Sequence, residues 1–330
     1  MLAHSNLRKV AELSGVSIST ASRALNGRTD VSPKTRARVL EVAKQLGYAP
    51  SSLAKGLWSG ETMTIGVVVT TILNPFYANL VAGIEKGLSD RGYTILLNST
   101  YGEPKKEWNA IKLLLEHRVD GMILGAVQTQ PDAVDLLVRN SVPFVLLGGG
   151  LPNAKTDFVA SDDLLVGKLA VNHLVNKGYD KILFLNARQS YSAKLRAEGF
   201  LAAVEANRSK VKKDWIKVIR SKDDVERALN EAKQEGIDPN AILCFNDDIA
   251  IEVMRYLKDR KIKVPHDIGV MGVDNLDVGA ILNPPLTTID INKNQIGTKA
   301  AEVLLKRMEN KDAEVNRIIL TPSLVERESS

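Results

Sequence analysis

Residues 7–27 read LRKVAELSGVSISTASRALNG, and their spacing predicts two short helices joined by a tight turn. In each segment small or apolar residues recur at the helical spacing i, i+3, i+4, namely Leu7, Val10 and Ala11 and then Ala21, Ala24 and Leu25. Ser17 is placed to cap the second helix, and Asn26 with Gly27 to end it. This pattern predicts a DNA-reading helix-turn-helix, although an ordinary helical hairpin would share it.

The second predicted helix leaves one face free for contact. Ile18, Ser19, Ser22 and Arg23 lie on that face, and all but the arginine are short enough to let the helix approach base edges in a major groove. An exposed isoleucine can meet a thymine methyl group but donates no hydrogen bond. The alternative is that Ile18 packs into the core of this small head.

The positive charge of the chain is concentrated around this motif. The chain of 330 residues carries a net charge of +5, and residues 1–61 hold nine Lys and Arg against four acidic residues. The remaining residues are therefore neutral, with 35 of each sign. A basic head on a neutral body predicts that a polyanion such as DNA contacts the head alone.

The composition excludes several other classes of protein. A single cysteine, Cys244, rules out an intramolecular disulfide framework and sits in an apolar run typical of a core strand. No apolar run approaches the ~20 residues that span a bilayer, so we expect a cytoplasmic, nucleoid-associated protein without a membrane partner.

The sequence also offers little for catalysis. The four histidines show no metal-ligand spacing, and no GxSxG, GxGxxG or Walker motif is present. The pairs Asp162/Asp163 and Asp247/Asp248 are adjacent residues, which on a strand would point to opposite faces and share no proton. We expect no catalytic residue, no metal and no cofactor.

A third helix and a hinge follow the motif. Ser32 and Pro33 open the helix, which should bury Val39, Leu40, Ala43 and Leu46 and end at Gly47. The segment 51–59, SSLAKGLWS, has the length of a two-turn helix, which is marginal in isolation. We expect this segment to be disordered when free and ordered only when paired with its dimer mate on DNA.

From residue 64 onward apolar strands alternate with segments of helical length, which predicts parallel βαβ units. The predicted strands form two sets, 64–69, 93–98, 121–125 and 144–148, and then 181–186, 215–219, 241–245 and 268–272. Their apolar character indicates burial on both faces, so each set should build its own doubly wound sheet. The last strands, near 287–291 and 317–320, are expected to cross back and make the lobes discontinuous.

The whole chain resembles the lactose/galactose repressor (LacI/GalR) family of dimeric bacterial transcription regulators. Five motifs carry the resemblance in the family's order, namely VAELSGVSISTASRALN at 10–26, GYAP at 47–50, NPFY at 74–77, GVDN at 272–275 and PPLTTI at 284–289. The resemblance implies an all-α helix-turn-helix head at 1–48, a hinge at 49–62 and a periplasmic-binding-protein-like α/β body at 63–330. Lobe one is expected at 63–160 and 291–319, and lobe two at 161–290 and 320–330.

The resemblance also assigns DNA contacts. It places Ile18, Ser19 and Arg23 at the operator-reading positions and Thr20 and Ser22 near phosphates, and Ser17 and Asn26 complete the set on the reading helix. In the hinge, Leu57 matches the family's leucine wedge, which enters the minor groove, and Lys55 lies beside it. The alternative is that Leu57 simply packs against Leu53 in an amphipathic turn, which would not exclude the wedge.

A homodimer is expected because the tetrameric members carry an extra C-terminal helix and this chain stops at VERESS. Two-fold symmetry then predicts a near-palindromic operator in double-stranded DNA.

Ligands of doubly wound folds lie outside the carboxyl ends of the strands. The segments that follow the predicted strands are polar there, and Phe76 offers an apolar face for a sugar ring. The resulting candidate effector site consists of Thr70, Phe76, Ser192, Arg196, Asn246 and Asp274, of which the resemblance marks the last four as sugar-gripping positions.

Two positions near this site stay open. Gly148 stands where some sugar-binding members place an aspartate, which leaves room for a larger or different ligand. Asp247 is as compatible with loop bracing or helix capping as with ligand binding.

These features together predict an effector-controlled, operator-specific regulator, most simply a repressor of a sugar-utilisation operon. The alternatives are a carbohydrate receptor with a vestigial head, a general DNA-bending protein, and a regulator controlled by a non-sugar metabolite or by a phosphoprotein.

Overall fold

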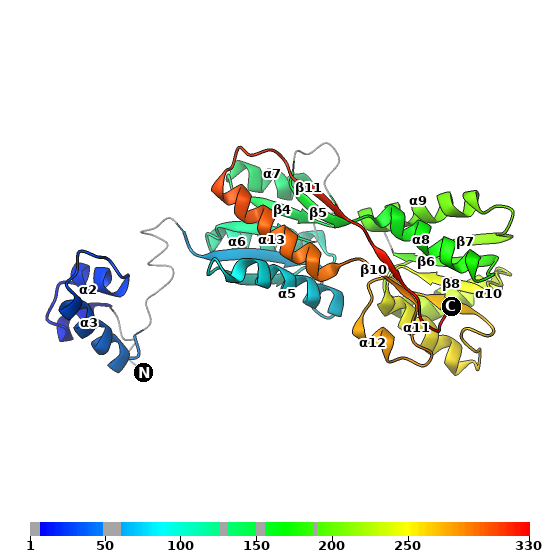
Figure 1. Cartoon of the computed structure of the whole chain (residues 1–330), viewed down its shortest axis with the longest axis horizontal. Helices are drawn as coiled ribbons and strands as arrows, with labels where there is room; N and C mark the ends of the chain where they lie inside the picture. Colours follow the sequence, from blue (N-terminus) through cyan, green and yellow to red (C-terminus); the bar gives the residue numbers. More distant parts are fainter. Residues whose placement is uncertain (1–6, 49–60, 126–130, 150–155, 188–189) are drawn as a thin grey trace. The chain divides into compact units, whose positions relative to one another are not determined.

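The computed structural model describes residues 7–48, 61–125, 131–149, 156–187 and 190–330. The chain divides into two compact units, residues Met1–Met63 and Thr64–Ser330. Each unit has its own hydrophobic core, and Figure 1 shows the helices and strands of both units.

The first unit contains three helices, α1 (Leu7–Leu13), α2 (Ile18–Leu25) and α3 (Pro33–Gln45). The predicted caps are confirmed, since Ser17 accepts a hydrogen bond from the Thr20 backbone N–H and Ser32 accepts one from that of Thr35. A small shared core holds the three helices together. Leu40 was expected in that core and is instead 47% exposed. Val42 takes its place as a half-buried packing residue, because it lies on the same face as Val39 and Ala43.

The second unit begins with a six-stranded parallel sheet in the order β11-β5-β4-β3-β1-β2 among the described residues. Its strands are β1 (Thr64–Val69), β2 (Thr94–Ser99), β3 (Gly121–Leu124), β4 (Phe144–Leu147), β5 (Phe158–Ser161) and β11 (Arg317–Leu320). Four of them match the first predicted set. Strand β5 was not predicted, because its four residues FVAS are too few and too mixed to stand out. The pairing of β5 with both β4 and β11 makes it a strand.

A second parallel sheet has the order β7-β6-β8-β9 among the described residues. It consists of β6 (Lys181–Ala187), β7 (Lys213–Ile219), β8 (Ala241–Cys244) and β9 (Gly269–Met271). A short antiparallel pair joins β10 (Thr288–Asp290) to β12 (Ser323–Val325). The chain therefore runs from the first sheet into the second and returns, and the C-terminal segment then passes from β11 toward the second sheet (Figure 1).

Helices cover both faces of each large sheet, as the doubly wound prediction requires. The first sheet has α5 (Pro75–Ser89) and α13 (Lys293–Glu309) on one face and α6 (Pro104–Glu116) and α7 (Pro131–Arg139) on the other. In the second sheet α8 (Asp163–Asn176) and α9 (Tyr191–Ala206) lie on one face, and α10 (Val225–Gln234) and α11 (Asp247–Asp259) on the other. Two short helices, η1 (Lys222–Asp224) and α12 (Asp277–Ala280), complete the unit.

Burial on both faces was predicted for every strand and is wrong for β2 and β7. Both are edge strands, and Leu97 of β2 and Val218 of β7 are 39% and 61% exposed. An apolar run does not show whether a strand has one neighbour or two, so this difference depends on strand order. In the central strand β1, by contrast, Val67 and Val68 belong to the cores on opposite faces and are fully buried.

Candidate functional site

The reading face of α2 is presented to solvent in the first unit. Ile18 is 46% exposed, which excludes its expected alternative role as a core residue of the head. Ser19 and Arg23 are exposed as well, whereas Ala21 and Ala24 are buried on the opposite face of the helix. The helix therefore separates a packing face from a polar face, and the polar face contains the predicted base-reading positions.

Short hydrogen bonds order the side chains at both ends of α2. The Ser17 and Thr20 hydroxyls lie 2.8 Å apart, and the Asn26 amide donates to the Ser22 hydroxyl at 3.5 Å. The Arg23 guanidinium forms an exposed ion pair with Asp30 at 2.8 Å. Exposed pairs contribute little to stability, so Arg23 can exchange Asp30 for a base or phosphate. The hinge contacts predicted for Lys55 and Leu57 lie outside the described residues.

In the second unit, all six predicted effector-binding residues line one cavity of about 580 Å³. The first lobe contributes Thr70 after β1 and Phe76 at the start of α5, and the second contributes Ser192, Arg196, Asn246 and Asp274. The cavity lies where the carboxyl ends of the strands of both sheets meet, as expected for doubly wound folds. Its volume falls within the range of small-molecule sites.

Arg196 is held rigidly in the wall of this cavity. Its Nε donates to Asp163 at 2.7 Å and its Nη1 donates to the Phe245 carbonyl at 2.5 Å. The guanidinium also stacks over the Phe245 ring, 4.4 Å from the ring centroid. Because Arg196 and Asp163 are both buried, the pair is well shielded from solvent. These contacts hold the guanidinium of Arg196 in one orientation in the cavity wall before any ligand binds.

Asp274 is the second charged group of the wall and is only 5% exposed. Its backbone adopts a φ of 113°, donates to the Ile289 carbonyl and accepts from Lys293 Nζ at 2.7 Å. Burial raises the pKa of its carboxyl well above the usual value, and the nearby Arg196 opposes that shift. A strained loop that holds a buried carboxylate toward a cavity is typical of a ligand-binding group.

Aromatic side chains form the first-lobe wall. Asn74 caps α5 by accepting from the Phe76 N–H at 2.8 Å, which fixes the turn that carries the two rings. Phe76 and Tyr77 then meet edge to face with centroids 4.9 Å apart. Burial raises the pKa of the Tyr77 phenol, and a hydrogen bond with Thr70 acts in the opposite direction. These rings offer an apolar surface to a ligand that is bound by polar groups elsewhere.

The aspartate pairs lie at the starts of helices and not on strands, which corrects the geometry expected from the sequence. Asp162 caps α8 and Asp163 binds Arg196. Asp247, in turn, accepts from the Leu276 N–H at 2.7 Å and from the Thr288 hydroxyl at 2.6 Å, and it does not line the cavity. Burial raises its pKa to about 6. Asp247 therefore braces the loop that carries Asp274, while its neighbour Asn246 both caps α11 and lines the cavity.

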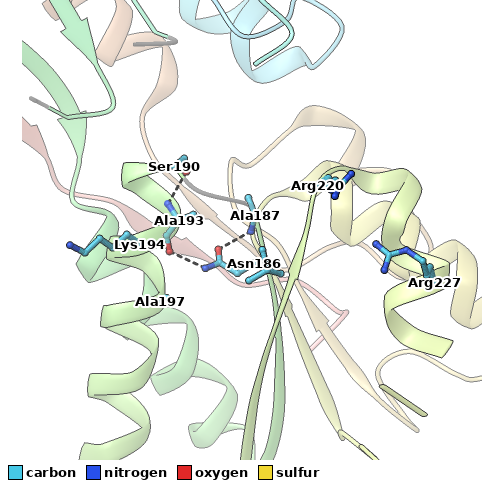
Figure 2. A pocket seen from close by; sticks show the side chains of 9 residues that line it. Asn186, Ala187, Ser190, Ala193, Lys194, Ala197, Arg220 and Arg227 are labelled. Atoms are coloured by element: carbon cyan, nitrogen blue, oxygen red, sulfur yellow. Dashed lines mark hydrogen bonds between the residues drawn. The ribbon is translucent and has the colours of Figure 1, made fainter. Parts of the chain in front are cut away.

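Helix α9 carries Ser192 and Arg196. Hydrogen bonds among Asn186, Ser190 and Ala193 position its start (Figure 2). Ser190 accepts from the Ala193 N–H, and the Asn186 amide donates to the Ala193 carbonyl, both at 2.9 Å. Residues 190–196 are therefore mostly helical, where the sequence suggested a loop. The groove in Figure 2 also contains Lys194, Arg220 and Arg227 but no aromatic residue, and Ser190 and Arg220 belong to the cavity as well.

The structure adds further residues to the cavity wall, of which sequence reasoning noted Gly148 and missed Glu107 and Ser161. Gly148, noted as a departure from sugar-binding members, does line the cavity, with a φ of 81° that favours glycine. Glu107 on α6 and Ser161 at the end of β5 line it too. Glu107 resembles a solvated helix residue in the run PKKEW, and Ser161 belongs to the unpredicted strand. Because β5 itself was not predicted, its end gave no signal for Ser161 in the sequence.

The described residues contain neither a membrane-spanning helix nor a cluster of metal ligands. No helix there combines the length and apolar character needed to cross a membrane. No group of three His, Cys, Asp or Glu side chains among them is arranged to hold a metal ion.

An exposed reading helix in one unit and a polar cavity between two doubly wound sheets in the other define a ligand-binding DNA regulator. Residues 6–51 match the family of bacterial regulatory proteins, lacI family, and residues 62–328 match the periplasmic binding proteins and sugar binding domain of LacI family. The chain belongs to the LacI family.

Individual proteins resemble it over nearly their whole length. The HTH-type transcriptional repressor PurR of Photobacterium profundum is 34% identical over 98% of both chains. The ribose operon repressor of Escherichia coli (strain K12) is 33% identical over 98% of this chain and 99% of its own. The structure is also similar to the Lac repressor dimer bound to operator and the anti-inducer ONPF, with a TM-score of 0.85, 27% identity and 98% coverage of each chain. This protein is accordingly a DNA-binding transcriptional regulator controlled by a small-molecule effector.

Proposed function

We propose that this protein is a repressor of a sugar-utilisation operon and that its effector is a small carbohydrate. The observation that carries the proposal is the convergence of six predicted residues from both lobes on one cavity. Hydroxyl, amide, carboxylate and guanidinium groups with an aromatic face suit a polyhydroxylated ring, because each sugar hydroxyl both donates and accepts. The sugar-binding family that matches residues 62–328 supports the same class of ligand.

In this proposal the head and hinge bind DNA, and the body binds the effector. The head, 1–48, reads DNA through Ser17, Ile18, Ser19, Thr20, Ser22, Arg23 and Asn26. The hinge, 49–62, adds Lys55 and Leu57 in the minor groove. The body, 63–330, binds the effector between lobe one (63–160 and 291–319) and lobe two (161–290 and 320–330), and it catalyses no reaction. The protein acts in the cytoplasm, associated with the nucleoid.

Regulation requires that the effector prefer one relative orientation of the two lobes. In a homodimer that orientation sets the spacing of the two hinge segments, and the spacing decides whether the hinge helices form on DNA. A coupling of about 1–3 kcal/mol changes operator affinity by up to ~150-fold, which suffices for control. Two reading helices related by two-fold symmetry then select a near-palindromic operator.

The test is a DNA-binding titration with the protein's own promoter and with a random duplex at moderate ionic strength, each repeated with a panel of sugars. We expect tight binding to the promoter alone and a change in that affinity with one sugar. Equal affinity for both duplexes would leave a carbohydrate receptor or a general DNA-bending protein instead. Promoter-specific binding that no sugar alters would point to a non-sugar metabolite or a phosphoprotein.

A further inference from the structure

Two buried polar groups in the cavity wall have no partner in the part of the chain that the structure describes. Glu107 is 6% exposed, and its Oε1 is closed to solvent without a hydrogen bond. Ser161 is 7% exposed, and its Oγ is unpaired in the same way. Buried polar groups in folded proteins are nearly always hydrogen-bonded, so two such groups along one cavity need an explanation.

The surrounding structure holds Glu107 firmly in this position. Helix α6 packs on β1 and β2, and Glu107 lies one turn from its start, after the loop that follows β2. That loop is tied to the end of β1, because the Thr100 N–H donates to the Val69 carbonyl at 3.0 Å and the Tyr101 N–H donates to the Thr70 carbonyl at 2.6 Å. The Glu107 carboxyl is therefore held in the cavity wall by its surroundings and is not a mobile surface side chain.

The electrostatic surroundings of Glu107 contain no compensating cation. Burial alone raises the pKa of its carboxyl from 4.5 to about 7, with no contribution from a neighbouring charge. The other ionisable side chains of the cavity are Tyr77, Tyr101, Asp163, Arg196, Arg220 and Asp274. Asp163 and Arg196 are paired with each other, and Arg220 is exposed. Among the cavity carboxyls, that of Glu107 thus lacks a compensating charge, whereas Arg196 and Lys293 act on that of Asp274 in the opposite lobe.

We infer that Glu107 forms a first-lobe subsite that accepts hydrogen bonds from the hydroxyl groups of an uncharged, polyhydroxylated effector, and that Ser161, elsewhere in the wall of the same cavity, offers that ligand a further acceptor. This inference rests on the proposed function and specifies the ligand class of that site. An anionic ligand is disfavoured because its charge would be buried in the cavity while the most buried cation, Arg196, is already paired with Asp163. An uncharged polyol can donate to Asp274 and to Glu107 at once, and so contact both lobes.

Glu107→Met provides the main test, because it keeps the length of the side chain and removes both acceptor oxygens. Glu107→Gln keeps one acceptor, and Ser161→Ala removes the further acceptor of the cavity wall. Glu116→Gln is the matched control, since Glu116 is exposed on the same helix and does not line the cavity. Each full-length variant is titrated by calorimetry with uncharged mono- and disaccharides, with the matching uronic acids and with amino sugars.

The wild-type protein and Glu116→Gln should bind an uncharged sugar equally well, and Glu107→Met should bind it at least tenfold more weakly. Glu107→Gln and Ser161→Ala should lie between these limits. Unaltered affinity in Glu107→Met would overturn the subsite and leave the proposed function intact. Tighter binding of a uronic acid or an amino sugar than of its uncharged counterpart would overturn the assignment of an uncharged ligand.

The melting temperature of the ligand-free protein tests the role of Glu107 without requiring that a sugar bind. If no sugar binds in the titrations, that result refutes the proposed function. An acceptor kept unpaired for a ligand destabilises the free protein. Glu107→Met should therefore melt at a higher temperature than the wild type at pH 8. An equal or lower melting temperature would show that Glu107 serves the fold, and would overturn the subsite.

Discussion

Replacement of Glu107 by glutamine should stabilise the ligand-free protein, and the gain should depend on pH in a defined way. Burial raises the pKa of the Glu107 carboxyl from 4.5 to about 7. One pKa unit corresponds to about 1.4 kcal/mol, so the difference between these values corresponds to roughly 3 kcal/mol of unfolding free energy. Glu107 lines a cavity and only its Oε1 is closed to solvent, so solvent screens part of this cost and we expect a gain of about 1–3 kcal/mol.

The sign follows from proton linkage. Below pH 4.5 both the folded and the unfolded protein hold the proton, and the carboxyl adds no pH-dependent cost. Between pH 4.5 and about 7 the unfolded chain has released the proton while the folded protein retains it. Stability therefore falls as pH rises through this window, and the full cost is present above it. Glutamine carries no charge, so Glu107→Gln should lack this contribution.

Urea unfolding followed by tryptophan fluorescence at pH 4.5, 6, 7 and 8 measures the effect. The variant should match the wild type near pH 4.5 and exceed it by about 1–3 kcal/mol at pH 8. Asp247, whose pKa burial raises to about 6, titrates in both proteins and cancels in the difference. The exposed control Glu116→Gln should follow the wild-type curve. A stability difference that does not change with pH, or a variant less stable at pH 8, would refute this account of Glu107.

Three other substitutions test the remaining parts of the account. Arg23→Ala should abolish discrimination between operator and random DNA in a footprint while calorimetric sugar binding persists, and unchanged selectivity would contradict the reading-helix assignment. Arg196→Ala should lose the ligand response. It should also lower stability by about 3–5 kcal/mol, because it leaves Asp163 buried and unpaired. The control Lys194→Ala, at an exposed position of the same helix, should change neither the ligand response nor the stability. Leu57→Ala should reduce operator bending in a gel-phasing assay with little change in head stability, and an unaltered bend angle would exclude the minor-groove wedge.

The sequence predicted local structure best where a single residue decides it. Ser17 has a hydroxyl that can satisfy a free N–H at a helix start, and the structure shows it doing so. Most inner strands were found because burial on both faces leaves a continuous apolar run. The inner strand β5 was missed because its four residues are too few and too mixed to stand out. The same rule failed for β2 and β7, since an edge position depends on strand order and leaves no mark in the run.

The sequence predicts which residues lie at the carboxyl edge of a sheet, but it does not predict which of them face the cavity. Residues that directly follow a predicted strand must lie at the carboxyl edge of its sheet, so Thr70, Asn246 and Asp274 could be placed near one cavity. Asp247 is adjacent in sequence to Asn246, but its side chain faces the opposite way and braces the loop that carries Asp274. Adjacent residues at a helix start point in different directions, and only packing selects the one that faces a ligand.

The sequence alone determined the exposed reading helix, the two alternating strand-and-helix sets and most of the polar residues around the cavity, because each depends on local periodicity or on one strand end. Tertiary structure decided which strands became edges, how Asp163 holds Arg196 and how α6 buries Glu107 beside the same cavity. These features arise from contacts between segments far apart in the chain, and no short window of sequence records the desolvation that such contacts impose.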